Sequence, residues 1–173
     1  MMRLATFAVV VVLAGTLQGC LLNNISQLSS EEALRPTPGR AVAVYGIGVE
    51  GQWDYPKFAV TLDEYDLERK SITGGCWRYN HMKAVTPATN KRVERFAFDV
   101  RPGHYVYSGF NASGLKGGPV AFEVPPNGAV YLGDFVYTSD RTVELRRSQS
   151  NPEGTTLAAV KPAPTPNIFL CAP

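Results

Sequence analysis

The sequence predicts an all-β fold, a sandwich of seven or eight short antiparallel strands preceded by a signal peptide and a flexible tether. From residue 40 onward, apolar residues recur with a period of two, the spacing of a strand with a buried face. Turn signals separate these runs about every 8–12 residues, as in β-sandwiches. The chain also contains 16 Gly and 13 Pro, which favour turns over long helices. A small barrel is the alternative architecture.

The first residues have the composition of an export signal. Met1-Met2-Arg3 carries one positive charge, and residues 4–17 are almost wholly apolar with no acid. This run is shorter than the roughly 20 apolar residues that span a bilayer. We therefore predict a cleaved signal peptide over residues 1–19. A plain secretory signal and an uncleaved anchor are the alternatives.

The signal ends in Leu17-Gln18-Gly19-Cys20, which resembles the lipobox of bacterial lipoproteins. The resemblance implies cleavage before Cys20, whose thiol takes a diacylglyceryl group, and a mature chain that acyl groups hold to the membrane. Gln18 departs from the small or apolar residue that the motif prefers at its position. The residue that follows Cys20 is Leu21 and not Asp. In Gram-negative lipoproteins of the resembled class, this implies sorting to the outer membrane. We expect a lipid-anchored envelope protein on the outer membrane, facing the periplasm.

The segment between the lipid and the sandwich is predicted to be a tether. Residues 20–39 are mostly polar and end in Arg35-Pro36-Thr37-Pro38-Gly39, whose prolines favour an extended path. The sandwich domain is expected over residues 40–148. Residues 149–173 are rich in Pro and small side chains, and we expect them to pack back on the domain.

Alternation of side chains defines the strands. In the first strand, Tyr45 and Ile47 alternate with Gly46 and Gly48. The same period of two is followed along the domain, and Gly133 inside a later run predicts a bulge. The predicted strands are residues 41–49, 58–63, 76–79, 92–100, 104–110, 120–124, 129–137 and 142–147.

One part of this pattern suggests a family. Residues 98–106, FDVRPGHYV, form a strand, a Pro-Gly turn and a second strand. Residues 122–128, FEVPPNG, and residues 130–135, VYLGDF, follow in that order. This arrangement resembles the prealbumin-like (transthyretin-like) modules of uncharacterised bacterial lipoproteins, over roughly residues 40–147. The resemblance implies a prealbumin-like or immunoglobulin-like sandwich of seven or eight strands, with no known catalytic activity and no functional residues to transfer.

The sequence has two cysteines in addition to Cys20. An even pair in an oxidising compartment predicts a disulfide between Cys76 and Cys171. Closing a loop of about 95 residues would stabilise the fold by roughly 4–5 kcal/mol in the chain-entropy model. Two separate buried thiols are the alternative.

Composition and motifs give little support to catalysis or to nucleic-acid binding. The net charge is +2 and includes Arg3 of the signal, so the mature chain lacks the basic face that nucleic acid requires. The histidines His81 and His104 are too few for a zinc site, even with Cys76 near the first of them. The glycines from Gly46 to Gly51 have dinucleotide-motif spacing, but no helix pattern follows them. We expect no enzyme, no metal and no cofactor.

Acidic side chains offer two further arrangements, and neither is favoured by the sequence. The acids at 63, 64, 66 and 68 lack the glycine-containing loop of an EF-hand, so we expect a solvated turn. Asp99 and Asp134 would serve glycoside cleavage only if the fold brought them together across a cleft. A hydrolase is therefore the third function class that we consider.

Aromatic side chains supply the one candidate ligand surface. Trp53, Tyr55, Trp77 and Tyr79 lie in or beside loops, where exposed rings would contact a glycan or a protein. The alternative is that these rings cover the core beneath long loops. The sequence thus predicts an envelope lipoprotein with a non-enzymatic structural or protein-interaction sandwich, and a glycan- or peptidoglycan-binding module is the second hypothesis.

Overall fold

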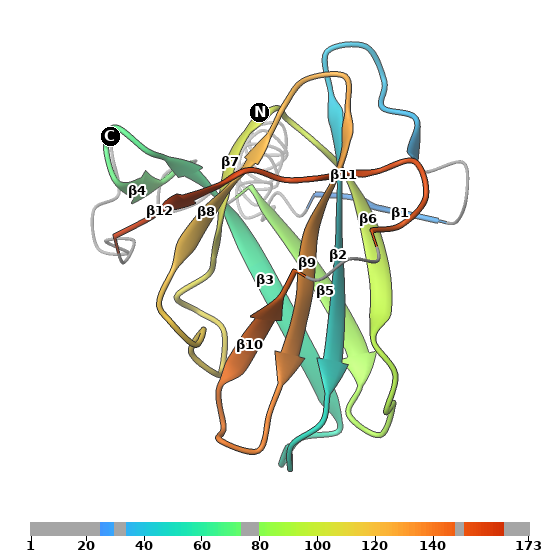
Figure 1. The fold of residues 1–173 in the computed structure, drawn as a ribbon, viewed down its shortest axis with the longest axis vertical. Coiled ribbons are helices and arrows are strands. Elements are labelled where there is room, and N and C mark those ends of the chain that lie inside the picture. The colour runs from blue at the N-terminus through green and yellow to red at the C-terminus, as the bar shows by residue number, and fades with distance from the viewer. Residues whose placement is uncertain (1–24, 30–33, 74–79, 148–150, 165–173) are drawn as a thin grey trace, which may run out of the picture.

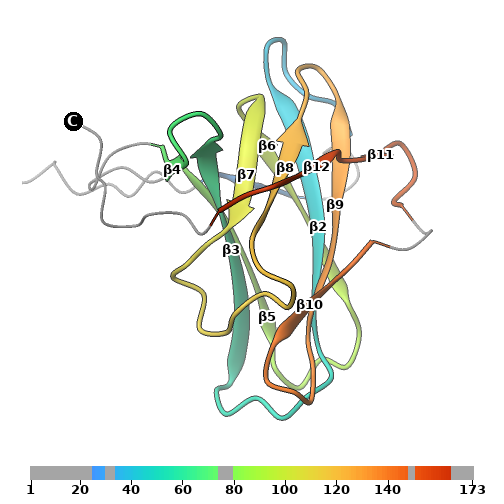
Figure 2. The ribbon, with the colours of Figure 1, turned by 60° about the vertical axis from the view of Figure 1, so that its left-hand side comes forward.

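A computed structural model describes residues 25–29, 34–73, 80–147 and 151–164. It confirms the predicted all-β sandwich, with two sheets packed face to face (Figures 1 and 2). Eight strands of this described part have four or more residues: β2 (Ala41–Val49), β3 (Lys57–Asp66), β5 (His81–Pro87), β6 (Glu94–Val100), β7 (Gly103–Tyr107), β8 (Val120–Val124), β9 (Ala129–Tyr137) and β10 (Val143–Arg146). The shorter strands are β1 (Gln27–Leu28), β4 (Ser71–Ile72), β11 (Thr156–Leu157) and β12 (Val160–Pro162).

Each sheet is built on four of the longer strands. One sheet has the order β6-β2-β9-β10, with β1 added beside β6 and β11 beside β9. The other has the order β8-β7-β3-β5, with β12 added beside β8 and β4 beside β3. The prediction of antiparallel strands holds for most pairs, but β2–β9 and β11–β9 are parallel. Side-chain alternation is the same in both directions, so the sequence pattern carries no information on strand direction.

Strand β5 was missed by the sequence pattern, although its apolar residues Met82 and Ala84 do alternate with Lys83 and Val85. The strand predicted at 76–79 lies outside the described residues. Strand β1 falls within the segment predicted to be a flexible tether, so residues 27 and 28 are docked on the sandwich. The tether prediction is wrong for these residues because the edge of β6 offers unpaired backbone groups that an adjoining chain can satisfy.

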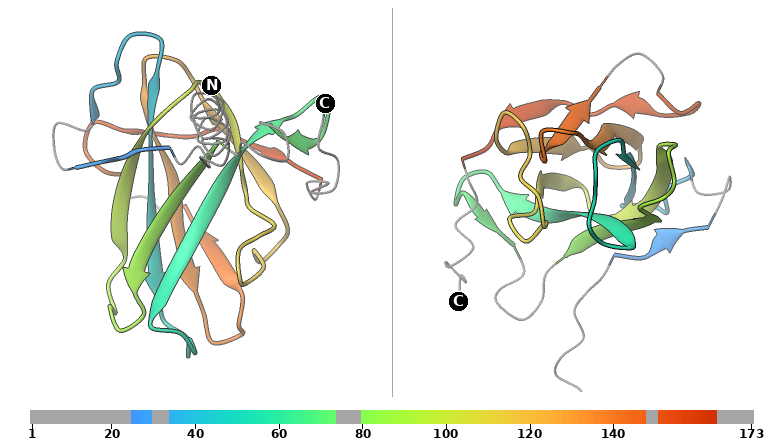
Figure 3. Two further views of the ribbon diagram at one scale, coloured as in Figure 1. Left: turned by 180° about the vertical axis from the view of Figure 1, so that it is seen from behind. Right: turned by 90° about the horizontal axis from the view of Figure 1, so that it is seen from below.

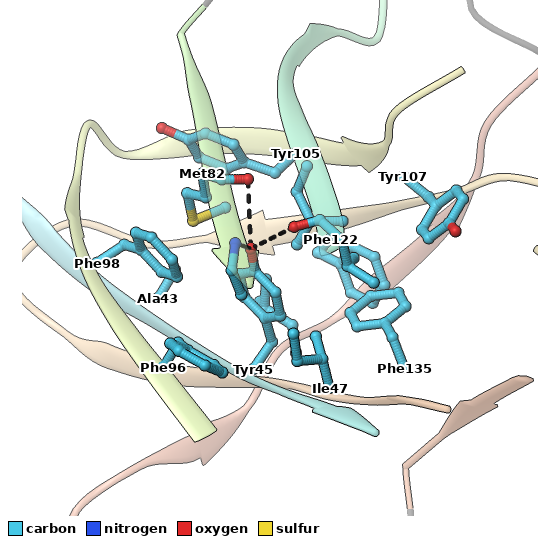
Figure 4. Packing of buried hydrophobic residues seen from close by; sticks show 14 of the residues in the cluster. Ala43, Tyr45, Ile47, Met82, Phe96, Phe98, Tyr105, Tyr107, Phe122 and Phe135 are labelled. Atoms are coloured by element: carbon cyan, nitrogen blue, oxygen red, sulfur yellow. Dashed lines mark hydrogen bonds between the residues drawn. The ribbon is translucent and has the colours of Figure 1, made fainter. Parts of the chain in front are cut away.

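The core lies between the sheets and is rich in aromatic rings. Inward-facing residues of β2 include Tyr45 and Ile47, and Phe98, Phe122 and Phe135 reach them from three other strands (Figure 4). The Tyr45 ring stacks on Phe98 with centroids 5.3 Å apart and meets the edge of Phe135 at 5.7 Å. Rings offset in this way add stabilisation beyond the apolar area that they bury.

A hydrogen-bonded tyrosine hydroxyl joins the two sheets through this core. Tyr45 extends from β2 and donates to the carbonyl oxygen of Val60 at 3.0 Å, with that of Met82 also near, at 3.3 Å (Figure 4). The same hydroxyl accepts from the Ala84 amide at 2.9 Å. Val60 and Ala84 are register partners in β3 and β5. Tyr45 therefore satisfies backbone groups of the opposite sheet that are shielded from water.

Glycine permits a bulge where β9 changes partners. The register between β2 and β9 shifts after Val44, which lies opposite Tyr131, so that Tyr45 lies opposite Gly133. Gly133 has a φ of +123°, a conformation that other residues avoid. Residues of β9 that precede the bulge pair with β11, and residues that follow it pair with β10. The bulge predicted at Gly133 is confirmed.

Both chain ends of the described part cross from one sheet to the other. In the N-terminal strap (residues 25–28), the Ile25 amide donates to His81 of β5 at 3.0 Å, and β1 then pairs with β6 (Figure 3). The C-terminal strap (residues 156–162) pairs first with β9 and then with β8, and passes across the sandwich in Figure 1. Each strap covers strand edges that would otherwise be open to pairing with other chains.

Replacing Tyr45 with Phe removes the hydroxyl and leaves the Ala84 amide and Val60 carbonyl buried without this partner. We expect the free energy of unfolding to fall by about 1–3 kcal/mol, measured by urea denaturation. Tyr107→Phe is the matched control, because its hydroxyl bonds one loop carbonyl, that of Ser113. An equal loss in the two variants would contradict the bridging role of Tyr45.

Candidate functional site

Several predicted functional residues lie outside the described residues. These are Leu17, Gln18, Gly19 and Cys20 of the lipobox, Cys76 and Cys171 of the predicted disulfide, and Trp77 and Tyr79 of the aromatic set. Trp53 and Tyr55 are described, and both lie in the loop between β2 and β3. We call this end of the sandwich, with the β5–β6 and β9–β10 loops, the far end. The opposite end, where the N-terminal strap docks, is the tether end.

Trp53 serves mainly to close the core at the far end. Its ring is half-buried and meets the edges of Phe58 and Tyr137 at centroid distances of 5.1 and 4.7 Å. Its indole nitrogen donates to the Lys57 carbonyl at 2.9 Å, which fixes the loop around it. Most of this ring is therefore committed to packing, as the alternative interpretation of the aromatic set expected.

Of the two described residues of the predicted aromatic set, Tyr55 is the one that faces solvent. Its ring is 65% exposed and packs edge-on against Trp53 at 5.8 Å. Phe110, in the β7–β8 connection, is 62% exposed and was not among the predicted contact residues. An apolar ring in a glycine-rich loop is an available sequence signal, but sequence alone does not separate an exposed ring from one that covers the core.

A polar pocket of about 200 Å³ opens at the tether end, beneath the N-terminal strap. Its charged lining residues come from three separate parts of the chain: Arg40 precedes β2, Glu64 lies near the end of β3, and Arg101 follows β6. Ile25, Ser26, Asn80 and Tyr105 complete the lining. The pocket thus combines cationic, anionic and amide groups at the tether end of the sandwich.

Hydrogen bonds hold much of this lining in place. Arg40 donates from Nε to a carboxylate oxygen of Asp99 at 2.8 Å and from Nη2 to the Asp99 carbonyl at 2.7 Å. The Asn80 amide donates to the Glu64 carboxylate. Tyr105 donates to the Arg101 carbonyl at 2.9 Å. Burial, with a smaller contribution from Glu64, raises the pKa of Tyr105, so the hydroxyl stays a donor at neutral pH.

The two carboxylates considered for glycoside cleavage do not form a pair. Asp99 lies beside Val42 in the sheet and binds Arg40, whereas Asp134 lies beside Gly46. Four residues of β2 separate these positions, which is about 13 Å along a strand. Asp134 fills space above Gly46, where a Cβ would overlap its carboxylate. The close approach of Asp134, and not a role in binding phosphate, explains why position 46 is a glycine.

The predicted acidic turn also does not converge on a cation. Asp66 accepts from the amides of Glu68 and Arg69, both at 2.9 Å, and so caps its own turn. Asp63 and Glu64 are adjacent in β3 and therefore face opposite sides of the sheet. Within the described ranges, no three His, Cys, Asp or Glu side chains are placed to hold a metal ion.

Asp63 is instead a buried carboxylate on the outer face of its sheet. The residue is 2% exposed, and one of its carboxylate oxygens has no hydrogen-bond partner. Burial raises the pKa of Asp63 from 3.8 to about 6, and a hydrogen bond with Ser108 opposes part of that rise. His81 is its register partner on β5, and desolvation lowers the pKa of that imidazole. An ionised Asp63 is therefore poorly compensated.

In comparisons with known proteins, no family model, no curated protein and no solved structure matches the chain. Among the described residues, no helix has the length and hydrophobicity that a membrane crossing requires.

Asp63→Asn should stabilise the protein at neutral pH. Because the pKa of Asp63 is higher in the folded chain than in the unfolded chain, its contribution to stability is lost as pH rises from 3.8 to about 6. The neutral amide avoids this loss, so we expect a gain of up to about 3 kcal/mol above pH 7 that fades below pH 4. Denaturant melts across this pH range measure it. Asp66→Asn is the control, and a gain that does not change with pH would contradict the burial argument.

Proposed function

We propose that this chain is a lipid-anchored lipoprotein of the bacterial cell envelope, and that its sandwich is a non-enzymatic structural or protein-interaction module. The observation that carries the proposal is the order of a positive start, an apolar run and Leu17-Gln18-Gly19-Cys20. The position of the N-terminal strap is consistent with it. The described residues begin at Ile25, five residues after Cys20, so cleavage before Cys20 removes no part of the described sandwich.

Cys20→Ala tests the anchor. The variant lacks the thiol that takes the diacylglyceryl group, so we expect it to leave the membrane fraction or to accumulate uncleaved. Fractionation and intact-mass measurement of the purified protein distinguish these results from wild type. Cys171→Ala is a control that keeps the lipobox. A Cys20→Ala protein that is cleaved and still as membrane-bound as wild type would rule out the lipid anchor.

The Cys76–Cys171 disulfide is part of the proposal, and the described chain near each cysteine supports it. The Tyr65 hydroxyl donates to the Pro164 carbonyl at 3.5 Å, and Tyr65 pairs with Ile72 in the adjoining strand. Cys76 follows Ile72 by four residues and Cys171 follows Pro164 by seven. Extended chain covers about 3.3–3.6 Å per residue, so the two cysteines are within reach of each other.

Mass spectrometry of the mature protein, alkylated without reductant, tests this bridge. We expect no alkylation of Cys76 and Cys171 until a reductant is added, and then two labels. Reduction should also lower the free energy of unfolding, by an amount up to roughly 4–5 kcal/mol. Two labels in the unreduced, denatured protein would exclude the disulfide.

The resemblance to prealbumin-like modules is also part of the proposal. Two sheets built on four longer strands each, with the Pro102-Gly103 turn leading from β6 to β7, are consistent with what the resemblance implies. A module of this kind would act through its surface. That makes the exposed loops of the far end and the polar pocket of the tether end the places to test.

A glycan- or peptidoglycan-binding role is the second candidate, and the exposed ring of Tyr55 favours it. Tyr55→Ala should lower retention on isolated peptidoglycan by roughly threefold to tenfold, the worth of one aromatic contact, without changing stability. Val85→Ala, a truncation of another exposed apolar side chain, is the control. Equal retention of the Tyr55→Ala and wild-type proteins would remove the aromatic surface from consideration.

A further inference from the structure

The N-terminal strap fixes the point at which the chain enters the sandwich. Ile25 bonds to His81 at the start of β5, and Gln27 and Leu28 pair with Phe98 and Ala97 of β6 (Figure 3). Backbone hydrogen bonds to both sheets hold this segment. An anchor at Cys20 therefore does not end in a free linker but in a segment attached to one end of the domain.

Chain length then limits how far that end can be from the lipid. Cys20 precedes Ile25 by five residues, which span at most about 18 Å. The far end lies beyond this distance. His81 and Pro87 are opposite ends of β5, and their six-residue separation corresponds to about 20 Å along the strand. Tyr55 lies in the loop beyond that end of the sheet.

The pocket beneath the strap has the chemistry of a phospholipid headgroup site. Arg101 is exposed and forms no ion pair with another described residue, so its guanidinium is available to a phosphate. Arg40 adds positive charge, although two of its nitrogens are bound to Asp99. Glu64 and Asn80 belong to the same lining and offer acceptor oxygens that suit a primary ammonium group.

We propose that the tether end of the sandwich faces the membrane, that its polar pocket takes headgroups bearing a phosphate and a primary amine, and that Tyr55 points away from the lipid. This inference rests on the proposed lipid anchor at Cys20. The inference adds an orientation of the domain and a class of ligand to that anchor. The far-end loops are then the surface presented to partners in the surrounding compartment.

The test uses the full protein, as the bacterial cell processes it, in vesicles of phosphatidylethanolamine and phosphatidylglycerol. A fluorophore is attached through an encoded azido amino acid either at Glu68, in the exposed β3–β4 turn, or at Tyr55. Lipids with a nitroxide on the headgroup serve as quenchers. We expect loss of most of the fluorescence at position 68 and little loss at position 55. Arg101→Glu should weaken quenching at 68, whereas the same charge change at the far end, Lys91→Glu, should not.

Each result has a separate meaning. Protein that does not float with the vesicles contradicts the anchor and thus the proposed function. Floating protein with equal quenching at both positions, or with stronger quenching at 55, overturns the orientation. Unchanged quenching in Arg101→Glu overturns the role of the pocket. Replacing phosphatidylethanolamine with phosphatidylcholine should weaken quenching at 68, and no change would exclude recognition of the amine.

Discussion

The Tyr45 hydroxyl joins the two sheets at the centre of the core, and the rest of the sandwich is arranged around it. A ring from β2 crosses the core to bind backbone groups of β3 and β5, which belong to the opposite sheet. Apolar side chains alone allow sheets to slide past each other, because hydrophobic burial has no direction. A buried hydroxyl with fixed partners does not allow this, since displacement would leave polar groups unsatisfied. The stacked Phe98 and the edge-on Phe135 hold the ring in this position.

The two straps also join the sheets, through backbone hydrogen bonds at the sides of the sandwich. An open two-layer structure exposes strand edges on both sides, and edges invite pairing with other chains. Here the N-terminal strap bonds to β5 and β6, and the C-terminal strap bonds to β9 and β8. Both straps lie toward the tether end. The far end is left to its loops, and Trp53 closes the core there while Tyr55 stays exposed.

This division separates two surfaces of different chemistry. The tether end has mixed charge, with Arg40 and Arg101 near Glu64 around a polar pocket. The far end has the exposed ring of Tyr55. A polar, charged surface suits headgroups or ions, whereas exposed rings suit a glycan face or a protein contact. For a protein whose N-terminal residue carries lipid, such a separation would place attachment and recognition at opposite ends.

The sequence by itself determined the all-β class, most strand positions and the bulge at Gly133, because these depend on local periodicity and on backbone preferences of single residues. It also contains Leu17-Gln18-Gly19-Cys20, a linear motif that resembles a lipobox and is recognised without a fold. Only the tertiary structure decided that β2 and β9 run parallel, that β1 docks within the predicted tether, and that Asp99 and Asp134 stay apart. The burial of Asp63 and the pocket between Arg40, Glu64 and Arg101 likewise depend on residues far apart in the chain. Strand direction, edge pairing and burial are set by which segments meet in space, and alternation along one strand does not record its neighbours.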